Sequence, residues 1–469
     1  MVSRVLPRTD NDGAHLHRPA GGETMASSFL GTLSAEDHLS VMRHPVQRHN
    51  VGVVEWLVTL LRRCRTFEDY DNVQRALFQH LHHCEEHRSQ CRRSATRLAR
   101  NRSLPTPLPT LPDGADPLDP RTWQIEDMVF DRVCRQLRAV GDALAWRVSR
   151  YDRRYVIALS SNDSCGPMAG KTGLPHELGA VIELRSQGSF GLLHDLTNCL
   201  RIGDITEFKP DGSRLLYEIK SSPNSKSGPQ RRRMRAAIEA VMHGGEQPGR
   251  PGNHIVVPTT RCRTHIRTFA SGIAAAVDDG ISGTAISSSR ALTAFSFETL
   301  GRTHMHATAA ELLADFHAAR QAAIRQAGIQ STLLHVKVSS VTRNHDFVPS
   351  VMPFALYPLH PHETALLICD YLGFEVTVAP ERITAHLERL GFTTDIPLPA
   401  ANDDLVATDT VITLRRGSGG LRLHPGALYE FLMESLDLST WAGAITEVMD
   451  DPKAPPHPLL AFATTRVWR

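Results

Sequence analysis

The first regular hydrophobic pattern in the chain lies between residues 51 and 100. Its apolar residues recur on one helical face: Trp56, Leu57, Leu60, Leu61, Val73, Leu77 and Leu81. This spacing is typical of amphipathic helices, and the strict alternation of a half-buried strand is missing. We therefore expect a small helical bundle over residues 39–103, preceded by a disordered tail over residues 1–38.

A stretch rich in proline and small polar residues follows the predicted bundle, over residues 104–120. Such a composition gives a stiff, extended linker, so we predict a domain boundary here. Beyond it, residues 124–140 have the pattern of an amphipathic helix. Residues 144–160 are predicted to form two strands joined by a polar turn around Asp152.

From residue 174 the pattern changes to alternating helices and strands. The first helix is predicted to carry an apolar stripe of Leu174, Leu178, Val181 and Ile182. The predicted order is helix, strand, strand, strand, helix and strand, over the ranges 174–188, 190–193, 202–208, 214–222, 227–242 and 254–260. The second and third strands form a β-hairpin, because Asp-Gly at its tip is a strong turn signal. These elements predict a compact α/β core within a domain over residues 121–300.

The remainder of the chain predicts a C-terminal α/β or α+β domain of unknown role over residues 301–469. Helical and strand patterns alternate from residue 266 onward, over the ranges 266–279, 309–324, 333–341, 374–379 and 409–414. No internal repeat is present, and no motif in this part indicates a particular chemistry.

Composition narrows the class of protein without indicating a function. The 469 residues are 41% hydrophobic and 22% charged, with a formal net charge of +2, which is ordinary for a soluble globular protein. The N-terminal residues lack the apolar segment of a signal peptide, and the longest apolar stretch, residues 51–61, is short and interrupted by Glu55. Eight scattered cysteines do not suggest a disulfide framework. We therefore expect a cytoplasmic protein with no membrane partner.

Lysine is scarce in this chain, so each lysine is informative. Of the 52 basic residues only six are lysines, which leaves 46 arginines. One lysine, Lys220, stands two places after Glu218 in a predicted strand, where alternate side chains share a face. A site that orients or activates a water needs a compact ammonium with a tunable pKa, which the planar guanidinium of arginine does not offer.

The hairpin also brings two carboxylates together. Asp204 on the preceding strand is expected to lie beside Glu218, and neighbouring carboxylates oppose each other's ionisation. A divalent metal ion removes this conflict, and ligands made only of oxygen favour a hard ion. The sequence therefore predicts Mg²⁺ (or Mn²⁺) as the cofactor, held by Asp204 and Glu218.

Asp204 followed by Glu218, Ile219 and Lys220 resembles the PD-(D/E)xK nuclease superfamily, which has the restriction-endonuclease-like αβββαβ core. The resemblance covers roughly residues 174–260 and implies that Asp204 and Glu218 bind the metal while Lys220 orients or activates the attacking water. Gly203 stands where the motif of this superfamily has proline.

Residues 173–188 also resemble the first helix of archaeal junction-resolving members, in which a helical glutamate completes the site. Glu177 borders the apolar stripe of this helix, whereas Glu183 points nearly opposite it, so Glu177 is the further catalytic residue implied. Gln230 could belong to a catalytic helix, but Ser227 and Gln230 also have the spacing of a capping box, which we favour.

A basic segment follows the predicted strand of Lys220. It contains five cations: Lys226, Arg231, Arg232, Arg233 and Arg235. They lie at a helix N-terminus, whose free N–H groups attract phosphate, so we predict that they bind nucleic acid. The alternative is a solvated helix face, which is our interpretation of the second basic run, residues 88–102.

Histidines and cysteines suggest two further sites. His80, Cys84, His87 and Cys91 share one helical face, which invites a zinc interpretation. Four ligands on one straight helix cannot surround a metal, so a second element would have to contribute, and we favour a packing face. Residues 358–374, with His360, His362 and Cys369, are interpreted as a loop leading into a buried helix.

These patterns together predict a metal-dependent nuclease that hydrolyses phosphodiester bonds, with DNA favoured over RNA. By analogy with this superfamily alone, we expect the protein to act in host defence or in DNA processing. A homodimer or a partner protein could assemble through either flanking domain. The alternative is a non-catalytic nucleic-acid-binding or scaffold protein that retains the nuclease fold.

Overall fold

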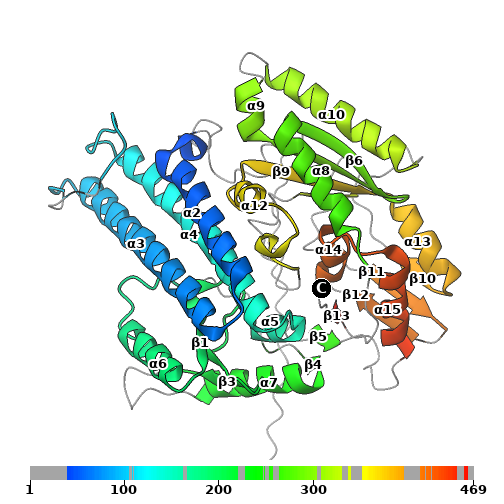
Figure 1. Cartoon of the computed structure of the whole chain (residues 1–469), viewed down its shortest axis with the longest axis horizontal. Coiled ribbons are helices and arrows are strands. Elements are labelled where there is room, and N and C mark those ends of the chain that lie inside the picture. Colours follow the sequence, from blue (N-terminus) through cyan, green and yellow to red (C-terminus); the bar gives the residue numbers. More distant parts are fainter. Residues whose placement is uncertain are drawn as a thin grey trace, which may run out of the picture.

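The computed structural model of the chain (Figure 1) consists of helices packed around three β-sheets. It describes residues 40–104, 108, 110–161, 166–219, 228–246, 248, 253–256, 263–303, 308–329, 336–339, 351–395, 412–417, 419–423, 425–450 and 459–462. The predicted N-terminal tail, Lys220 and Lys226 lie outside these residues.

Three long helices form the N-terminal part of the fold: α2 (Pro45–Arg63), α3 (Phe67–Ala99) and α4 (Pro120–Val148). They lie side by side (Figure 1), and α3 packs most extensively against α4. The helices predicted within residues 51–100 and 124–140 are confirmed. Trp56 differs from the prediction, because 46% of its surface is exposed while Leu57 and Leu61 are buried.

The two strands predicted over residues 144–160 are wrong. Helix α4 continues to Val148, and a short helix, α5 (Arg153–Leu159), follows it. Arg150 and Tyr151 turn the chain between them with positive φ angles of 58° and 60°. The pattern misled because residues 143–146 are buried on every side of α4, so their spacing carries no helical period.

A three-stranded antiparallel sheet follows α6 (Leu174–Ser186), in the order β1 (Phe190–Leu193), β2 (Ile205–Phe208) and β3 (Arg214–Tyr217). The hairpin is as predicted, with Ile205 opposite Tyr217 and Gly212 in its turn at φ 87°. Ile182 was predicted to join the buried stripe of α6, but it is 69% exposed and Leu184 is buried in its place.

Strand β3 is shorter than the predicted strand over residues 214–222. It ends at Tyr217 because the N–H of Ile219 donates to the side chain of Asp204 and not to a backbone carbonyl of β2. Glu218 therefore lies immediately beyond the end of the strand.

The predicted helix and last strand of the core are present as α7 (Gly228–His243) and β5 (Asn253–Val256), with a short strand, β4 (Gly245–Glu246), between them. The order of elements thus follows the prediction. The sheet membership differs, because β5 pairs antiparallel with β4 and parallel with β13 (Leu459–Phe462) and does not pair with β1, β2 or β3 in the described residues. The fold is mixed α/β, and β5 belongs to a second sheet.

That second sheet has the order β10-β11-β12-β13-β5-β4, where β10 is Thr393–Asp395, β11 is Ile412–Arg416 and β12 is Gly419–Leu423. A third sheet has the order β6-β7-β9-β8. Its strands are β6 (Ile281–Ser287), β7 (Arg290–Ser296), β9 (Leu372–Val378) and β8 (Val336–Ser339). Helices α8 (Ile266–Asp279) and α10 (Ala309–Gln326) pack on β6 and β7. The predicted helices and strands of this part are confirmed, whereas the β6-β7 hairpin was not predicted.

The described residues of this part also form the helices α9 (Phe297–Thr303), α12 (Pro361–Ile368), α13 (Pro380–Arg389), α14 (Pro425–Met433) and α15 (Leu438–Asp450). Residues 364–368 of α12 are all buried, so the buried helix predicted within residues 358–374 is confirmed, although His362 lies inside it and not in the loop before it. His360 caps α12 through its ring nitrogen, and His362 contacts Glu55 at 2.9 Å.

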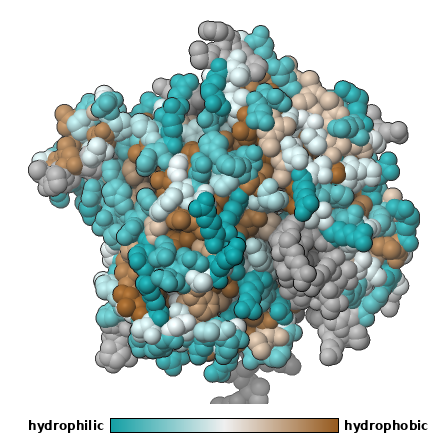
Figure 2. Space-filling model, in the orientation of Figure 1, coloured by the Kyte–Doolittle hydropathy of each residue, from teal (hydrophilic) through white to brown (hydrophobic). Residues whose placement is uncertain are grey.

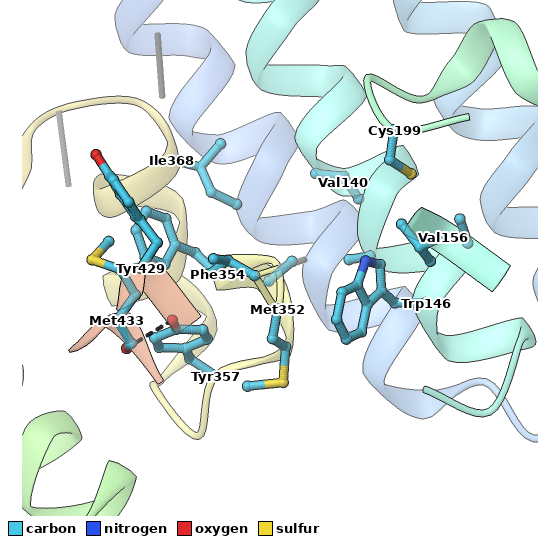
Figure 3. Close-up of a cluster of buried hydrophobic side chains, with 14 of the residues drawn as sticks. Val140, Trp146, Val156, Cys199, Met352, Phe354, Tyr357, Ile368, Tyr429 and Met433 are labelled. Carbon is cyan, nitrogen blue, oxygen red and sulfur yellow. Dashed lines mark hydrogen bonds between the residues drawn. The ribbon is translucent and has the colours of Figure 1, made fainter. Parts of the chain in front are cut away.

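One hydrophobic core runs from the N-terminal helices into the C-terminal part of the chain. Figure 3 draws buried side chains of this core from α4, α5, the 3-10 turn at Phe354–Leu356, α12 and α14: Val140, Trp146, Val156, Phe354, Tyr357, Ile368, Tyr429 and Met433. Polar contacts reinforce it, since Arg62 on α2 donates to the carbonyl oxygens of Tyr357 at 2.8 Å and Ala355 at 3.1 Å.

The face of the molecule seen in Figure 2 is covered mainly by hydrophilic side chains, with smaller hydrophobic areas between them. Among the described helices, none is both long enough and apolar enough to cross a membrane.

Candidate active site

The backbone of Asp204 is fixed between two neighbouring segments. Its N–H donates to the Tyr217 carbonyl at 2.8 Å, and its carbonyl accepts from the N–H of His194 at 3.0 Å. Gly203 makes this approach possible: its φ is 81°, and a Cβ there would lie 2.8 Å from Leu216 and 3.1 Å from the Tyr217 carbonyl oxygen. Only glycine at position 203 allows the backbone of Asp204 to come this close to β3.

The side chain of Asp204 closes the end of the hairpin. Its Oδ2 accepts a hydrogen bond of 2.7 Å from the N–H of Ile219, which brings Glu218 beside it. Burial is the largest cause that raises the pKa of Asp204 to about 6; the Ile219 hydrogen bond opposes this, and the carboxylates of Glu218 and Glu177 add to it. Asp204 and Glu218 are thus electrostatic neighbours, as the sequence predicted.

Helix α6 contributes Glu177, whose surface is only 2% exposed. Its Oε1 lies 2.8 Å from the Nζ of Lys171, and the same Nζ lies 3.9 Å from Oδ1 of Asp204. Glu183, on the opposite side of α6, is exposed. The structure therefore groups Glu177, and not Glu183, with Asp204 and Glu218.

Two members of this group were missed by the sequence analysis. Lys171 contacts Asp195 as well, with 2.7 Å between Nζ and Oδ2, so its ammonium lies among three carboxylates. Burial lowers the pKa of Lys171, but its contacts with Asp195 and Glu177 outweigh burial and raise it. The scarcity of lysine was a signal that could have found Lys171; Asp195, in a short 3-10 turn after β1, gives no such signal.

A buried polar network positions both of these residues from distant helices. Arg138 of α4 pairs with Glu85 of α3, and its Nε donates to the carbonyl oxygen of Asp195 at 3.1 Å. Glu85 in turn accepts a hydrogen bond of 2.6 Å from the N–H of Met168, in the loop that carries Lys171. The α3-α4 pair is therefore part of the support of the site.

His194 is a structural neighbour and not an additional acid or base. Its ring nitrogens contact the Gly203 carbonyl at 3.0 Å and the Thr206 hydroxyl at 2.8 Å. Burial is the main cause that lowers the pKa of His194 to about 3, so the ring is neutral at neutral pH and fixes the segment before β2.

Helix α7 presents three of the five predicted basic residues to solvent, namely Arg231, Arg232 and Arg235, while Arg233 is half-buried. Ala237 and Ala240 face the core. Ile238, one residue after Ala237, is 48% exposed.

The site consists of four carboxylates and one ammonium in the described residues: Glu177, Asp195, Asp204, Glu218 and Lys171. The ligands available are oxygens only, which suits Mg²⁺ or Mn²⁺. Burial, and after it the carboxylates of Glu218 and Glu177, raise the pKa of Asp204, and a bound divalent ion would oppose both effects.

Comparison with known proteins does not extend this description. Neither protein-family models, nor curated proteins, nor solved structures give a match to this chain.

Proposed function

We propose that this protein is a metal-dependent nuclease that hydrolyses phosphodiester bonds, with DNA as its preferred substrate. The observation that carries the proposal is the group of Glu177, Asp204 and Glu218 around one end of a β-hairpin, with the pKa of Asp204 raised to about 6. Perturbed carboxyl groups that share a site are typical of functional centres. The resemblance to the PD-(D/E)xK superfamily supplies the reaction class.

Asp204 and Glu218 would hold Mg²⁺ or Mn²⁺, with Glu177 completing the ligand set. When bound, such an ion lowers the pKa of a water and stabilises charge on the phosphate under attack. Asp204 is well placed for this role because its Oδ2 is oriented by the Ile219 N–H, which leaves Oδ1 directed toward the side of Lys171.

The two lysines of this region would have different roles. Lys171 is held as an ammonium by Asp195 and Glu177, so it serves as a counter-ion that keeps these carboxylates in place and is too tightly paired to act as a base. Lys220, two residues after Glu218 in the sequence, remains the candidate for orienting the attacking water.

The exposed arginines of α7 would bind the substrate backbone. Helix α7 begins at Gly228, shortly after Glu218 in the chain, and it presents Arg231, Arg232 and Arg235 to solvent. Phosphate contacts of this kind fix the position of a nucleic acid without reading its sequence.

One observation favours an alternative function. Strand β5 does not join the sheet of β1, β2 and β3 in the described residues, so the core departs from the restriction-endonuclease-like arrangement. A protein that kept the acidic site and lost catalysis would bind nucleic acid or act as a scaffold.

The test is cleavage of labelled duplex, single-stranded and branched DNA and of RNA by the pure full-length protein, with Mg²⁺, Mn²⁺ or EDTA. We expect cleavage with either ion and none in EDTA, and we expect Asp204→Ala, Glu218→Ala and Lys220→Ala each to lower the rate by at least about 100-fold, because groups that act on one reacting water form a unit. Lys220→Arg should also lose cleavage, because the guanidinium keeps the charge but is not a compact donor with a tunable pKa.

Glu183→Ala is the matched control, because Glu183 lies on the same helix as Glu177 but is exposed. It should cut at the wild-type rate. Binding without cleavage under every condition would support the alternative, and undiminished cleavage in EDTA would remove the metal from the mechanism.

A further inference from the structure

A second group of metal-binding side chains lies far along the chain from the carboxylates of the candidate active site. His87 and Cys91 are four residues apart on one face of α3, and Glu126 faces them from α4. The Nε2 or Nδ1, Sγ and carboxylate oxygen of these residues lie within 4.8 Å of one another. The second element that a metal site on α3 requires is therefore provided by α4.

We propose that His87, Cys91 and Glu126 bind a Zn²⁺ ion that joins α3 to α4. Zinc takes nitrogen, sulfur and carboxylate ligands in a tetrahedron, with bonds of about 2.0–2.3 Å. Two ligand atoms of such a tetrahedron are about 3.4 Å apart when the bonds are about 2.1 Å. The separation of His87 Nε2 and Glu126 Oε2 is 3.4 Å, so this pair has the required spacing.

His87 is arranged as a ligand and not as a hydrogen-bond partner. Its Nε2 is buried and makes no hydrogen bond within the described residues, although Glu126 is its neighbour. Its ring stacks on Phe130 with 4.0 Å between centroids, which fixes the direction of the nitrogen. A buried nitrogen that makes no hydrogen bond costs free energy that a metal bond would recover.

The ligands of the site balance the charge of a divalent ion, and their chemical types favour zinc over a hard ion. Cys91 is fully buried and Glu126 is 2% exposed. Zn²⁺ with one thiolate, one carboxylate and a neutral imidazole has no net charge, which suits a buried position. Sulfur and nitrogen ligands distinguish this site from the oxygen-only group at Asp204 and Glu218.

His44 orients the carboxylate from outside the ligand set. Its Nδ1 accepts a hydrogen bond of 3.3 Å from the N–H of Val46, so its Nε2 carries the proton and donates to Oε1 of Glu126 at 2.8 Å. This leaves Oε2 for the metal. Such outer hydrogen bonds are a regular feature of metal sites and hold the ligand in place. A water completes the four-coordinate ion.

Cobalt is the probe for this site, because Co²⁺ replaces zinc and absorbs light. The full-length protein is stripped of metal with a chelator, dialysed and titrated with Co²⁺ alone. We expect one equivalent to bind with the near-ultraviolet band of a Co²⁺–thiolate bond and the intense visible bands of four coordination, and we expect one equivalent of Zn²⁺ to abolish both.

Variants locate the ion. Cys91→Ser should lose the thiolate band, His87→Gln should bind at least about 10-fold more weakly, and His44→Gln should weaken binding by about 10-fold to 100-fold while keeping the band. Cys84→Ser is the matched control, since Cys84 is buried on the same helix outside the cluster, and it should titrate like the wild type.

The proposal is overturned if the wild type binds no Co²⁺, or binds it without a thiolate band, because the cluster is then only an ion-paired packing contact. It is equally overturned if Cys91→Ser keeps the band. Should Cys91→Ser fail to fold, the wild-type titration and the zinc content of the untreated protein still decide the question.

Discussion

At the scale of single residues, Asp204 meets two opposing demands. Its carboxylate accepts the Ile219 N–H, which favours the ionised form, yet it is partly buried and lies beside Glu218 and Glu177, which disfavours that form. The second influence prevails, and the pKa rises to about 6. In the metal-free protein, the ionised form of Asp204 is therefore held at a cost to stability.

This cost can be measured as a pH-dependent difference between Asp204→Asn and the wild type. Because the pKa is about 6 in the folded protein and about 3.9 in the unfolded chain, the folded state binds the proton more tightly, and wild-type stability falls as pH rises from about 4 to 6. Asparagine can still accept the Ile219 N–H but does not ionise. In urea unfolding with EDTA, Asp204→Asn should be the more stable protein above pH 6, with the difference vanishing near pH 4.

Asp211→Asn provides the control of opposite sign. Hydrogen bonds from Ser213 lower the pKa of Asp211, which is an exposed turn residue. Its contribution to stability is therefore present above its unfolded pKa and lost as the pH falls, so Asp211→Asn should be slightly less stable than the wild type at neutral pH. A neutral or destabilising Asp204→Asn at pH 7.5 would contradict our account of the site.

At the scale of elements, the proposed function assigns substrate binding to α7 and chemistry to the acidic site. Arg231, Arg232 and Arg235 are exposed to solvent, whereas Ala237 and Ala240 are buried on the side of the helix that packs against α5. The helix itself does not depend on these arginines, so their charge can be removed without unfolding it.

Arg231→Gln with Arg235→Gln should weaken binding to every DNA sequence. Each phosphate contact contributes about 0.9 to the log-log slope of affinity against salt, so the slope should fall by about one to two units, measured by fluorescence anisotropy from low to moderate salt. Cleavage at saturating substrate should change little. The matched control is Arg93→Gln with Arg100→Gln, which removes the same charge from exposed positions on α3 and at its C-cap. Equal losses in the two double variants would mean that α7 contributes only net charge.

At the scale of the whole molecule, α5 is joined to the C-terminal part by a buried ion cluster. Arg153 pairs with Glu430 of α14 and with Glu434, at 2.9 Å from the latter, and all three side chains are almost fully buried. Glu434 also accepts a hydrogen bond of 2.8 Å from the N–H of Met352. A single guanidinium thus joins three segments that are distant in sequence.

Arg153→Met should lower the free energy of unfolding by about 3–5 kcal/mol, because it leaves two buried carboxylates without their counter-charge. Adding Glu430→Gln and Glu434→Gln to this variant removes those charges and should restore much of the loss in chemical denaturation. If the triple variant is no more stable than Arg153→Met, the cost is one of packing and not of charge.

Local parts of the fold and site were predictable, and parts assembled over long distances were not. The hairpin and the pairing of Asp204 with Glu218 depend on a few consecutive residues and an Asp-Gly turn, so the sequence indicates them. Lys171 and Asp195 are placed by Glu85 and Arg138, from helices whose relative position no local pattern specifies. Helix α5 was missed because its residues are buried on nearly all sides, so its hydrophobic residues do not recur with a helical period.

Helix α4 packs against α2, α3, α5 and the two 3-10 turns at His194–Leu196 and Phe354–Leu356. Glu126 lies near its start, Arg138 and Asp142 hold the segment of Asp195 and Asn198, and Trp146 contributes to the shared core near its end. Gly141 leaves no room for change, because a Cβ there would lie 1.8 Å from the Leu196 carbonyl oxygen. Because one helix carries contacts to the acidic site and to the shared core, a truncation that removes α4 should disrupt both of them together.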